Sequence, residues 1–179
     1  MINDIKEVLI TEEQLKETVK KLAEQVNRDY KGKNVLLVSV LKGAVVFMAD
    51  FMRELDLKCE IDFMVVSSYG SGVRTSGNVK IIKDLDVPIE GRDVLIVEDI
   101  LDSGVTLSNL IRMLQERKPN SIEICTLLDK PERRAAQVNA KYIGITVPDE
   151  FVVGYGLDFD EKYRNLPFVG VLKPEVYTK

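Results

Sequence analysis

The chain has 179 residues, of which 45% are hydrophobic and 30% charged, and its formal net charge is −4. This length is typical of one domain with its own core, and the acidic balance argues against a broad nucleic-acid-binding surface. No apolar run reaches the roughly 18–20 residues of a membrane helix, and the N-terminus lacks a signal-peptide pattern, so we expect a cytoplasmic protein with no membrane partner.

Histidine is absent from the sequence, and only two cysteines are present. Without imidazole, acid–base chemistry has to come from carboxylates, lysines or tyrosines. Cys59 and Cys125 both lie in apolar, strand-like surroundings, and their spacing fits no zinc motif, which favours buried free thiols. Any metal ion should therefore prefer oxygen ligands, and Mg²⁺ is the first candidate.

The N-terminal half predicts helices and buried strands. Thr11 and Gln14 have the spacing of a capping box, and the apolar residues that follow keep helical spacing until Lys31–Gly32. The strand predicted at 35–40 leads into Lys42–Gly43 and a helix at 44–55. Lys42–Gly43 is either an ordinary strand-to-helix turn or a phosphate contact, because ligands of α/β proteins bind beyond the carboxyl ends of strands.

The stretch 67–77 separates two further predicted strands, at 61–66 and 78–82. It is rich in Gly and Ser and contains almost no core-forming residues. Such a stretch is either a solvated hairpin loop or a lid, and Tyr69 and Arg74 give it side chains with which to close.

The sequence VLIVEDILDSGVT, at 94–106, is the most informative about function. Its first four residues predict a buried strand, and an amphipathic helix follows it. A turn containing Gly104 at a helix N-terminus offers unpaired N–H groups to an anion, although a purely structural turn is the alternative. A metal ion or sugar hydroxyls between the anion and the protein would explain the three carboxylates of this loop, Glu98, Asp99 and Asp102.

The C-terminal part predicts more strands, at 121–128, 142–147, 151–155 and 168–172. Strands that alternate with helices indicate an α/β fold with a mainly parallel central sheet flanked by helices. The carboxyl ends of such strands share one edge of the sheet. We therefore expect one rim to carry the polar residues that follow these strands: Lys42, Glu98, Asp99, Asp102 and Lys130.

These motifs resemble those of the type I phosphoribosyltransferases. VEDILDSGVT at 97–106 is similar to the segment with which that family binds phosphoribosyl pyrophosphate, and its EDILDSG form is similar to that of the hypoxanthine-guanine phosphoribosyltransferases. The resemblance covers nearly the whole chain and includes VLKG at 40–43, SSYG at 67–70, LDKP at 128–131, FVVGYGLD at 151–158 and YRNL at 163–166. It implies a single type I phosphoribosyltransferase domain over residues 1–179, with a small hood formed by the N- and C-terminal segments.

The resemblance implies an Mg²⁺-dependent enzyme of purine salvage. Such an enzyme transfers the 5-phosphoribosyl group of phosphoribosyl pyrophosphate to N9 of hypoxanthine or guanine, giving IMP or GMP and pyrophosphate, and has no nucleic-acid partner. Relatives form homodimers or homotetramers. A xanthine or adenine preference stays open, as does a regulatory nucleotide or RNA sensor, although the acidic charge and the presence of Asp102 and Lys130 favour the enzyme.

The resemblance also implies roles for single residues. Asp102 would be the catalytic acid or base at purine N7, and Lys130 would donate to purine O6. The 5-phosphate would lie against Ser103, Gly104, Val105 and Thr106. The ribose hydroxyls and Mg²⁺ would be positioned by Glu98 and Asp99, and a second Mg²⁺ would lie near Asp158.

The remaining implied contacts concern the base, the pyrophosphate and the lid. Phe151 would stack on the base, and the backbone of Val152 would meet its edge. Lys42–Gly43 and Arg164 would contact pyrophosphate, and in relatives the Lys42–Gly43 peptide is cis. The lid, which would keep water from the reacting sugar, would carry Ser68 and Tyr69.

Overall fold

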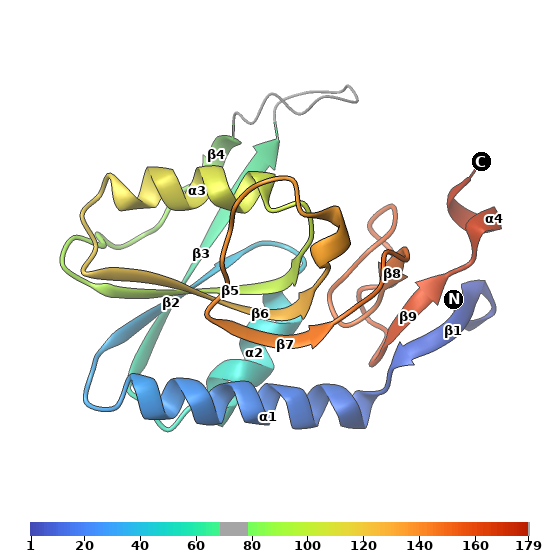
Figure 1. Ribbon diagram of the computed structural model, residues 1–179, viewed down its shortest axis with the longest axis horizontal. Coiled ribbons are helices and arrows are strands. Elements are labelled where there is room, and N and C mark those ends of the chain that lie inside the picture. The colour runs from blue at the N-terminus through green and yellow to red at the C-terminus, as the bar shows by residue number, and fades with distance from the viewer. Residues whose placement is uncertain (69–78, 179) are drawn as a thin grey trace.

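The computed structural model describes residues 1–68 and 79–178 (Figure 1). In these residues the larger sheet has the strand order β4-β3-β2-β5-β6-β7, and every neighbouring pair is parallel except β3 and β4. The predicted α/β architecture is therefore confirmed. The strands are β2 (Val35–Val40), β3 (Cys59–Ser68), β4 (Val79–Lys83), β5 (Asp93–Leu101), β6 (Ser121–Asp129) and β7 (Tyr142–Thr146).

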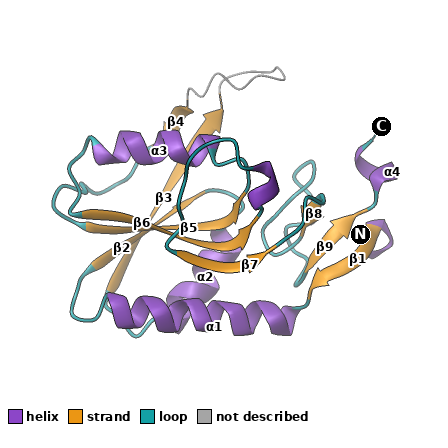
Figure 2. Ribbon diagram, viewed as in Figure 1, coloured by secondary structure: helices purple, strands orange, loops and turns teal. Residues whose placement is uncertain are grey.

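Helices cover both faces of this sheet. On one face lie α1 (Glu12–Asp29) and α2 (Val45–Glu54), and on the other lies α3 (Val105–Gln115) (Figures 1 and 2). Successive strand residues point to opposite faces, so β2 places Leu37 against α1 and α2 but Leu36 against α3. β2 and the first half of β5 are buried on both faces, which is why their sequences contain continuous apolar runs.

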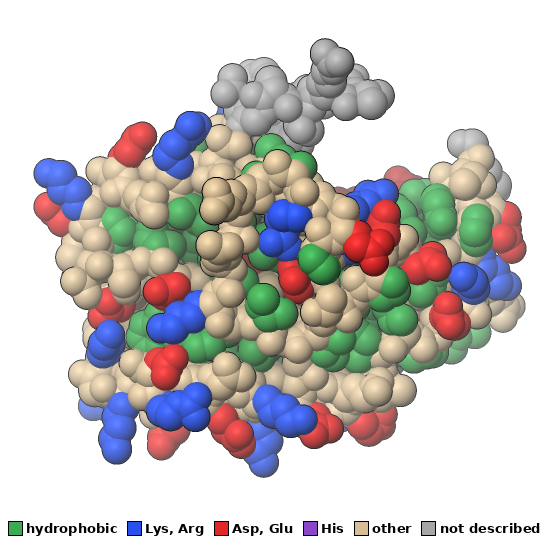
Figure 3. Space-filling view, in the orientation of Figure 1, with side chains coloured by type: hydrophobic (Ala, Val, Ile, Leu, Met, Phe, Trp, Pro, Cys, Tyr) green, Lys and Arg blue, Asp and Glu red, His purple; other side chains and the backbone are tan. Residues whose placement is uncertain are grey.

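The predicted capping box begins α1. The Thr11 hydroxyl accepts a hydrogen bond from the Gln14 N–H at 3.2 Å, and the Gln14 side chain accepts one from the Thr11 N–H at 2.8 Å. Basic and acidic side chains are interspersed along the outer face of this helix (Figure 3). None of the helices in the described ranges is long and apolar enough to cross a membrane.

The chain ends meet in a second, antiparallel sheet, with the order β1-β9-β8. Its strands are β1 (Ile5–Ile10), β8 (Val152–Val153) and β9 (Val169–Leu172), and the short helix α4 (Pro174–Tyr177) follows. The sheet lies beside the carboxyl ends of β5 and β6 (Figure 1). It is the hood that the resemblance implied. The predicted strand at 151–155 is only two residues long, because the chain turns at Gly154, whose φ is +98°.

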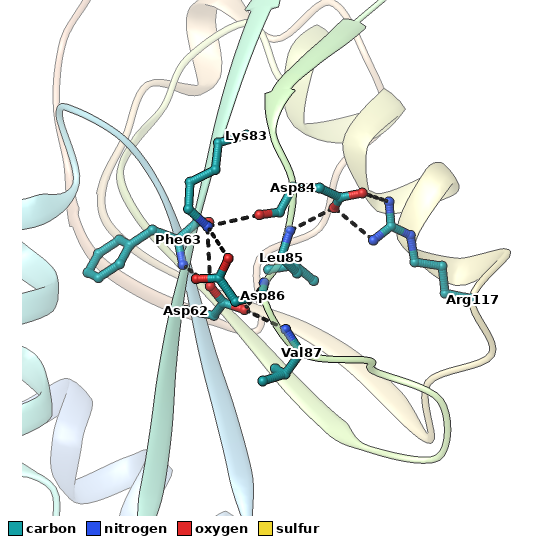
Figure 4. Close-up of polar contacts among 8 residues, drawn as sticks. All are labelled: Asp62, Phe63, Lys83, Asp84, Leu85, Asp86, Val87 and Arg117. Atoms are coloured by element: carbon teal, nitrogen blue, oxygen red, sulfur yellow. Dashed lines mark hydrogen bonds and ion pairs between the residues drawn. The ribbon is translucent and has the colours of Figure 1, made fainter.

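A buried carboxylate fixes the connection between β4 and β5 (Figure 4). Asp62, on β3, is only 5% exposed. Its Oδ1 accepts a hydrogen bond from the Phe63 N–H at 2.7 Å, and its Oδ2 accepts from the N–H groups of Asp86 at 2.7 Å and Val87 at 3.3 Å. The carboxylate thus satisfies backbone donors of a loop that has no strand partner.

Two basic side chains, Lys83 and Arg117, also stabilise the β4–β5 loop by hydrogen bonds. Lys83 Nζ donates to the carbonyls of Phe63 and Asp84, each at 2.9 Å. Arg117, which follows α3, donates to both carboxylate oxygens of Asp84 at 2.8 and 2.9 Å (Figure 4). Asp84 therefore joins the β4–β5 loop to the end of α3.

Candidate active site

Two adjacent cavities open at the carboxyl ends of β5 and β6. The first, here called the phosphate cavity, has a volume of ≈ 180 Å³ and is lined by Glu98 and by the turn that begins α3. The second, here called the base cavity, has a volume of ≈ 290 Å³ and is lined by Lys130 and by Phe151 of the hood. Asp102 lines both cavities. Of the five polar residues predicted to share one rim, Glu98, Asp102 and Lys130 therefore line these cavities, whereas Lys42 and Asp99 line neither.

The turn at 102–106 forms the N-terminus of α3. Gly104 precedes the helix with a φ of +75°, a left-handed conformation that glycine adopts without strain. The Val105 N–H meets the Ser103 hydroxyl at a long 3.4 Å, and no side chain of the turn caps the helix. Free N–H groups and the positive end of the helix dipole thus face the phosphate cavity.

Arg134 supports this turn from behind, and sequence reasoning missed it. Its Nε donates to the Asp102 carbonyl at 3.0 Å, and its Nη2 donates to the Asp129 carboxylate. The Ser103 carbonyl accepts the N–H groups of Ala135 and Ala136 at 2.9 and 3.1 Å. The segment after β6 therefore fixes the backbone of the turn, and the only sequence signal was its place just after LDKP.

Glu98 and Asp99 lie within β5, which corrects their predicted place in a loop. Their strand continues through Leu101 because β6 continues to pair with it, from Glu98 opposite Thr126 to Leu101 opposite Asp129. The polar side chains end the apolar run but not the hydrogen-bonded ladder. Since neighbouring strand residues face opposite ways, Glu98 lines the phosphate cavity and Asp99 lies on the side of α2.

Burial opposes the charged form of both carboxyls, and the positive charge of Arg164 offsets this only in part, at Asp99. Burial raises the pKa of Glu98 well above its usual range, and the Asp99 charge adds to the rise. Burial also raises the pKa of Asp99 to about 6, although a 2.7 Å hydrogen bond from the Ile100 N–H opposes this. Glu98 Oε1 and Asp102 Oδ1 are both buried and have no hydrogen-bond partner among the described residues. Such oxygens call for a cation or for hydroxyl donors.

The Lys42–Gly43 turn lies directly against Asp99. A Cβ on Gly43 would collide with the Asp99 carboxylate, and one on Gly156 would collide with the Gly43 carbonyl. The cis peptide joins Leu41 to Lys42, one bond before the position that the resemblance implied. The Leu41 N–H still donates to Met64 of the neighbouring strand at 2.9 Å, so the chain leaves the sheet at the next peptide.

Asp158 and Arg164 form an ion pair near this turn. Arg164 Nη2 lies 2.9 Å from Asp158 Oδ1, and Arg164 Nη1 donates to the Gly156 carbonyl at 2.8 Å. Arg164 Nε is buried and has no hydrogen-bond partner in residues 1–68 and 79–178. Glu161, another residue that sequence reasoning missed, accepts a 2.8 Å bond from the exposed Lys42 ammonium and lies 3.5 Å from Arg164.

Lys130 is only 5% exposed, which is unusual for a lysine. Its ammonium donates to the Glu150 carbonyl at 2.9 Å and keeps two further N–H donors beside the base cavity. Phe151 is 38% exposed, and Ile100 and Leu157 supply apolar wall. A flat, apolar ligand with a hydrogen-bond acceptor at one edge fits such a cavity.

The predicted lid lies almost entirely outside the described residues. Tyr69 and Arg74 lie outside the described residues, and Ser68 is described only as the last residue of β3. The lid thus stays a prediction.

Among the described residues, no group of three or more acidic or cysteine side chains could hold a metal ion. An ion at Glu98 and Asp99 would need further oxygen ligands from a substrate or from water.

Comparisons with known proteins agree with this geometry. Residues 9–160 match the model of the phosphoribosyl transferase domain. The hypoxanthine-guanine phosphoribosyltransferase of Staphylococcus aureus strain Mu50 is 56% identical over 178 residues, or 99% of each chain. The bifunctional protein TilS/HprT of Listeria monocytogenes serotype 4b is 54% identical over all 179 residues, which make up 28% of that longer protein.

A solved structure of a hypoxanthine phosphoribosyltransferase also has the same fold as this chain. The crystal structure of a hypoxanthine phosphoribosyltransferase from Staphylococcus aureus superposes with a TM-score of 0.98 at 55% identity, over 100% of this chain and 97% of that one. The implied type I phosphoribosyltransferase fold is confirmed. The chain belongs to the phosphoribosyl transferase family, among its hypoxanthine-guanine phosphoribosyltransferases.

Proposed function

We propose that the protein is an enzyme of purine salvage that transfers the 5-phosphoribosyl group of phosphoribosyl pyrophosphate to N9 of hypoxanthine or guanine. The products are IMP or GMP and pyrophosphate. One observation carries the proposal: Asp102 lines both the phosphate cavity and the base cavity. A substrate pair that fills both cavities would have its reacting atoms beside this carboxylate.

The phosphate cavity suits the 5-phosphate. Free N–H groups at the start of α3 point toward it, and Ser103 and Thr106 add hydroxyl donors. Gly104 lets the backbone approach closely, and the main chain of Val105 belongs to the same turn. The phosphate would therefore bind mainly to the backbone.

The carboxylates of β5 would face the ribose. The 2- and 3-hydroxyls can donate to Glu98 and Asp99, and Glu98 Oε1 has no partner in the part of the chain that the structure describes. The same oxygens, with Asp158 nearby, suit Mg²⁺, because the ion prefers hard oxygen ligands and takes only one or two carboxylates beside substrate oxygens. When bound, Mg²⁺ would offset the negative charge of the pyrophosphate.

Asp102 would hold the proton that the purine exchanges. As N9 bonds to C1 of the ribose, the bond from C1 to the pyrophosphate oxygen breaks, and the proton of the ring nitrogen N7 passes to the carboxylate. Asp102 Oδ1 is buried and accepts no hydrogen bond from any described residue, so it can accept a proton or a hydrogen bond from the substrate.

The base cavity would select 6-oxopurines. The Lys130 ammonium can only donate, so it suits the O6 acceptor of hypoxanthine and guanine and disfavours the 6-amino group of adenine. Phe151 would stack on the ring, and the backbone of Val152 would meet its edge. Lys42–Gly43 and Arg164 would bind pyrophosphate, and Arg164 Nε, which has no partner among the described residues, supports this role.

We further propose that residues 1–179 act as a single domain, that the enzyme works in the cytoplasm, and that it forms a homodimer or homotetramer. The Listeria protein supports the first point, because the same unit is there one part of a longer chain.

Pyrophosphate release with four purines tests the activity. Hypoxanthine, guanine, xanthine and adenine are each supplied with phosphoribosyl pyrophosphate, with and without Mg²⁺. We expect Mg²⁺-dependent release with hypoxanthine and guanine and little with adenine. Preferred use of xanthine would correct the substrate, and no turnover with any base would favour a nucleotide sensor that retained the site.

A further inference from the structure

Three aromatic side chains from separate segments meet beside the base cavity. Phe151 precedes β8, Phe159 lies in the loop after it, and Tyr177 ends α4. The rings of Phe151 and Tyr177 are stacked, with centroids 4.8 Å apart and planes inclined by 20°. Phe159 meets Phe151 edge to face at 5.6 Å and 87°, and it lies 6.4 Å from Tyr177.

This packing leaves part of Phe151 free. Tyr177 covers one face of the ring, and the three centroid distances put Phe159 to its side rather than on the opposite face. Phe151 nevertheless keeps 38% of its surface exposed, and both Phe151 and Tyr177 contribute to the lining of the base cavity. The uncovered face is the part of this ring available to a flat ligand.

The position of Tyr177 is fixed through the chain ends. Lys173, just before α4, donates from its N–H to the Asp4 carbonyl at 2.9 Å and from its Nζ to the Asn3 carbonyl at 2.7 Å. Val176 packs against the small buried cluster of the hood. The tyrosine ring is therefore held by an anchored helix, although it lies next to the end of the chain.

We propose that Tyr177 is a positioning residue for the purine. Its ring backs Phe151 and restricts the rotamers of that side chain, so that the free face of Phe151 is already oriented for stacking when the base arrives. The inference rests on the proposed function, since it takes the base cavity to be the purine site. It adds a layer to that site: purine, Phe151 and Tyr177 in one stack.

Steady-state kinetics of Tyr177 variants test the proposal. In Tyr177→Ala the KM for hypoxanthine and guanine should rise by about three- to tenfold, the range expected for one aromatic pair. The kcat and the KM for phosphoribosyl pyrophosphate should stay near the wild-type values, because Tyr177 lies outside the phosphate cavity. Tyr177→Phe keeps the ring and should restore the wild-type KM for the base.

Val176→Ala is the matched control, because it loosens the same helix without touching the aromatic stack. If Val176→Ala raised the KM for the base as much as Tyr177→Ala does, docking of α4 and not the tyrosine ring would be responsible, and the proposal would be wrong. Thermal unfolding of each variant checks that the fold is kept.

A double-mutant cycle tests whether Tyr177 acts through Phe151. In a Phe151→Leu background, Tyr177→Ala should have no further effect on the KM for the base. An equal effect in both backgrounds would overturn the proposal, as would an unchanged KM in Tyr177→Ala.

Calorimetric measurement of guanine and GMP binding distinguishes a failure of the proposed function from a failure of this inference. A wild type that binds no purine would overturn the proposed function and this inference together, whereas an active wild type with an unaffected Tyr177→Ala variant would overturn this inference alone.

Discussion

Asp102 differs from the other site carboxylates because its side chain borders both cavities. The phosphate, in contrast, would bind to the backbone that follows it. In Asp102→Asn we therefore expect kcat to fall by about 10²–10⁴-fold, as general acid–base catalysis is lost. Affinity for phosphoribosyl pyrophosphate, measured by calorimetry, should change much less.

Asp149→Asn provides the control for Asp102→Asn. Asp149 also lines the base cavity, but it pairs with Arg133 at 2.7 Å. Its replacement should affect turnover far less. A catalytic role for Asp102 would be refuted by wild-type turnover in Asp102→Asn, or by an equal loss in Asp149→Asn.

Lys130 should determine the preference for a 6-oxo group. Glutamine at this position offers both a donor and an acceptor, so the ratio of kcat/KM for hypoxanthine to that for adenine should fall in Lys130→Gln. The expected change is roughly ten- to a hundredfold, since a hydrogen bond to a charged group contributes about 1.5–3 kcal/mol. Lys141→Gln, at a lysine remote from the cavity, should leave the ratio unchanged. The same ratio in both variants would contradict the role of Lys130.

Single residues were predictable where a motif carries them. The 98–106 segment and Lys130 are brought together by the structure as the sequence indicated, because parallel strands end at one edge. Arg134, Glu161 and Tyr177 were not predictable. Their contacts join segments that only the folded chain brings together, and a surface arginine or a C-terminal tyrosine has no local pattern that reveals such contacts.

Elements were predicted best where their own residues determine them. The capping box of α1 and the apolar runs of β2 and β5 are local signals. The end of β5 is not a local signal, because pairing with β6 extends it through Glu98 and Asp99. β1 escaped prediction for a similar reason: half of its residues are exposed, and only pairing with β9 makes it a strand.

The buried Asp62 carboxylate should stabilise the β4–β5 connection strongly. Asp62→Ala leaves three backbone N–H groups without their acceptor. We expect the free energy of unfolding, from urea titration, to fall by roughly 2–4 kcal/mol. Asp62→Asn keeps one acceptor oxygen and should lose less. Equal stability of the alanine variant and the wild type would show that water replaces the carboxylate.

The Asp84–Arg117 pair should make a pH-dependent contribution to stability. The hydrogen bonds from Arg117 lower the pKa of the Asp84 carboxyl below its usual value. A lowered pKa means that the stabilisation is present above the unfolded-state pKa of about 3.9 and is lost as the pH falls through the folded-state value. Both side chains are partly exposed, so screening limits the effect to about 0.2–1 kcal/mol.

Urea titrations of wild type and Arg117→Gln at pH 7 and pH 3 measure this contribution. The difference in unfolding free energy should be present at pH 7, shrink at pH 3 and shrink in high salt. A difference that is independent of both pH and salt would mean that Arg117 stabilises the loop by packing alone.

The candidate active site lies between two parts of the molecule, the six-stranded sheet and the hood. The six-stranded sheet supplies Asp102 and Lys130, whereas the hood supplies Phe151 and Val152. The sequence predicted the sheet from its own periodicity but indicated the hood only through resemblance. The hood strands pair residues from opposite ends of the chain, such as Ile5 with Leu172, and no local pattern encodes such a pairing.

A nucleotide product should therefore stabilise both parts at once. GMP with Mg²⁺, at about 100 times its dissociation constant, should raise the free energy of unfolding by about 2.7 kcal/mol. Its phosphate would contact the turn at 102–106, and its base would contact the hood at Phe151 and Val152. Slower amide hydrogen exchange should consequently appear at the start of α3 and in β8 and β9.

Ribose 5-phosphate provides the control for this experiment, because it has the phosphate and the sugar but no base. It should slow amide hydrogen exchange at the start of α3. Exchange in the hood should stay close to the rate measured without ligand. If GMP also protected the start of α3 alone, the purine would not reach the hood. The purine-binding site would then have to be assigned to another part of the molecule. A base that stacks on Phe151 should restrict the opening of the adjacent hood strands β8 and β9, and so slow their amide exchange.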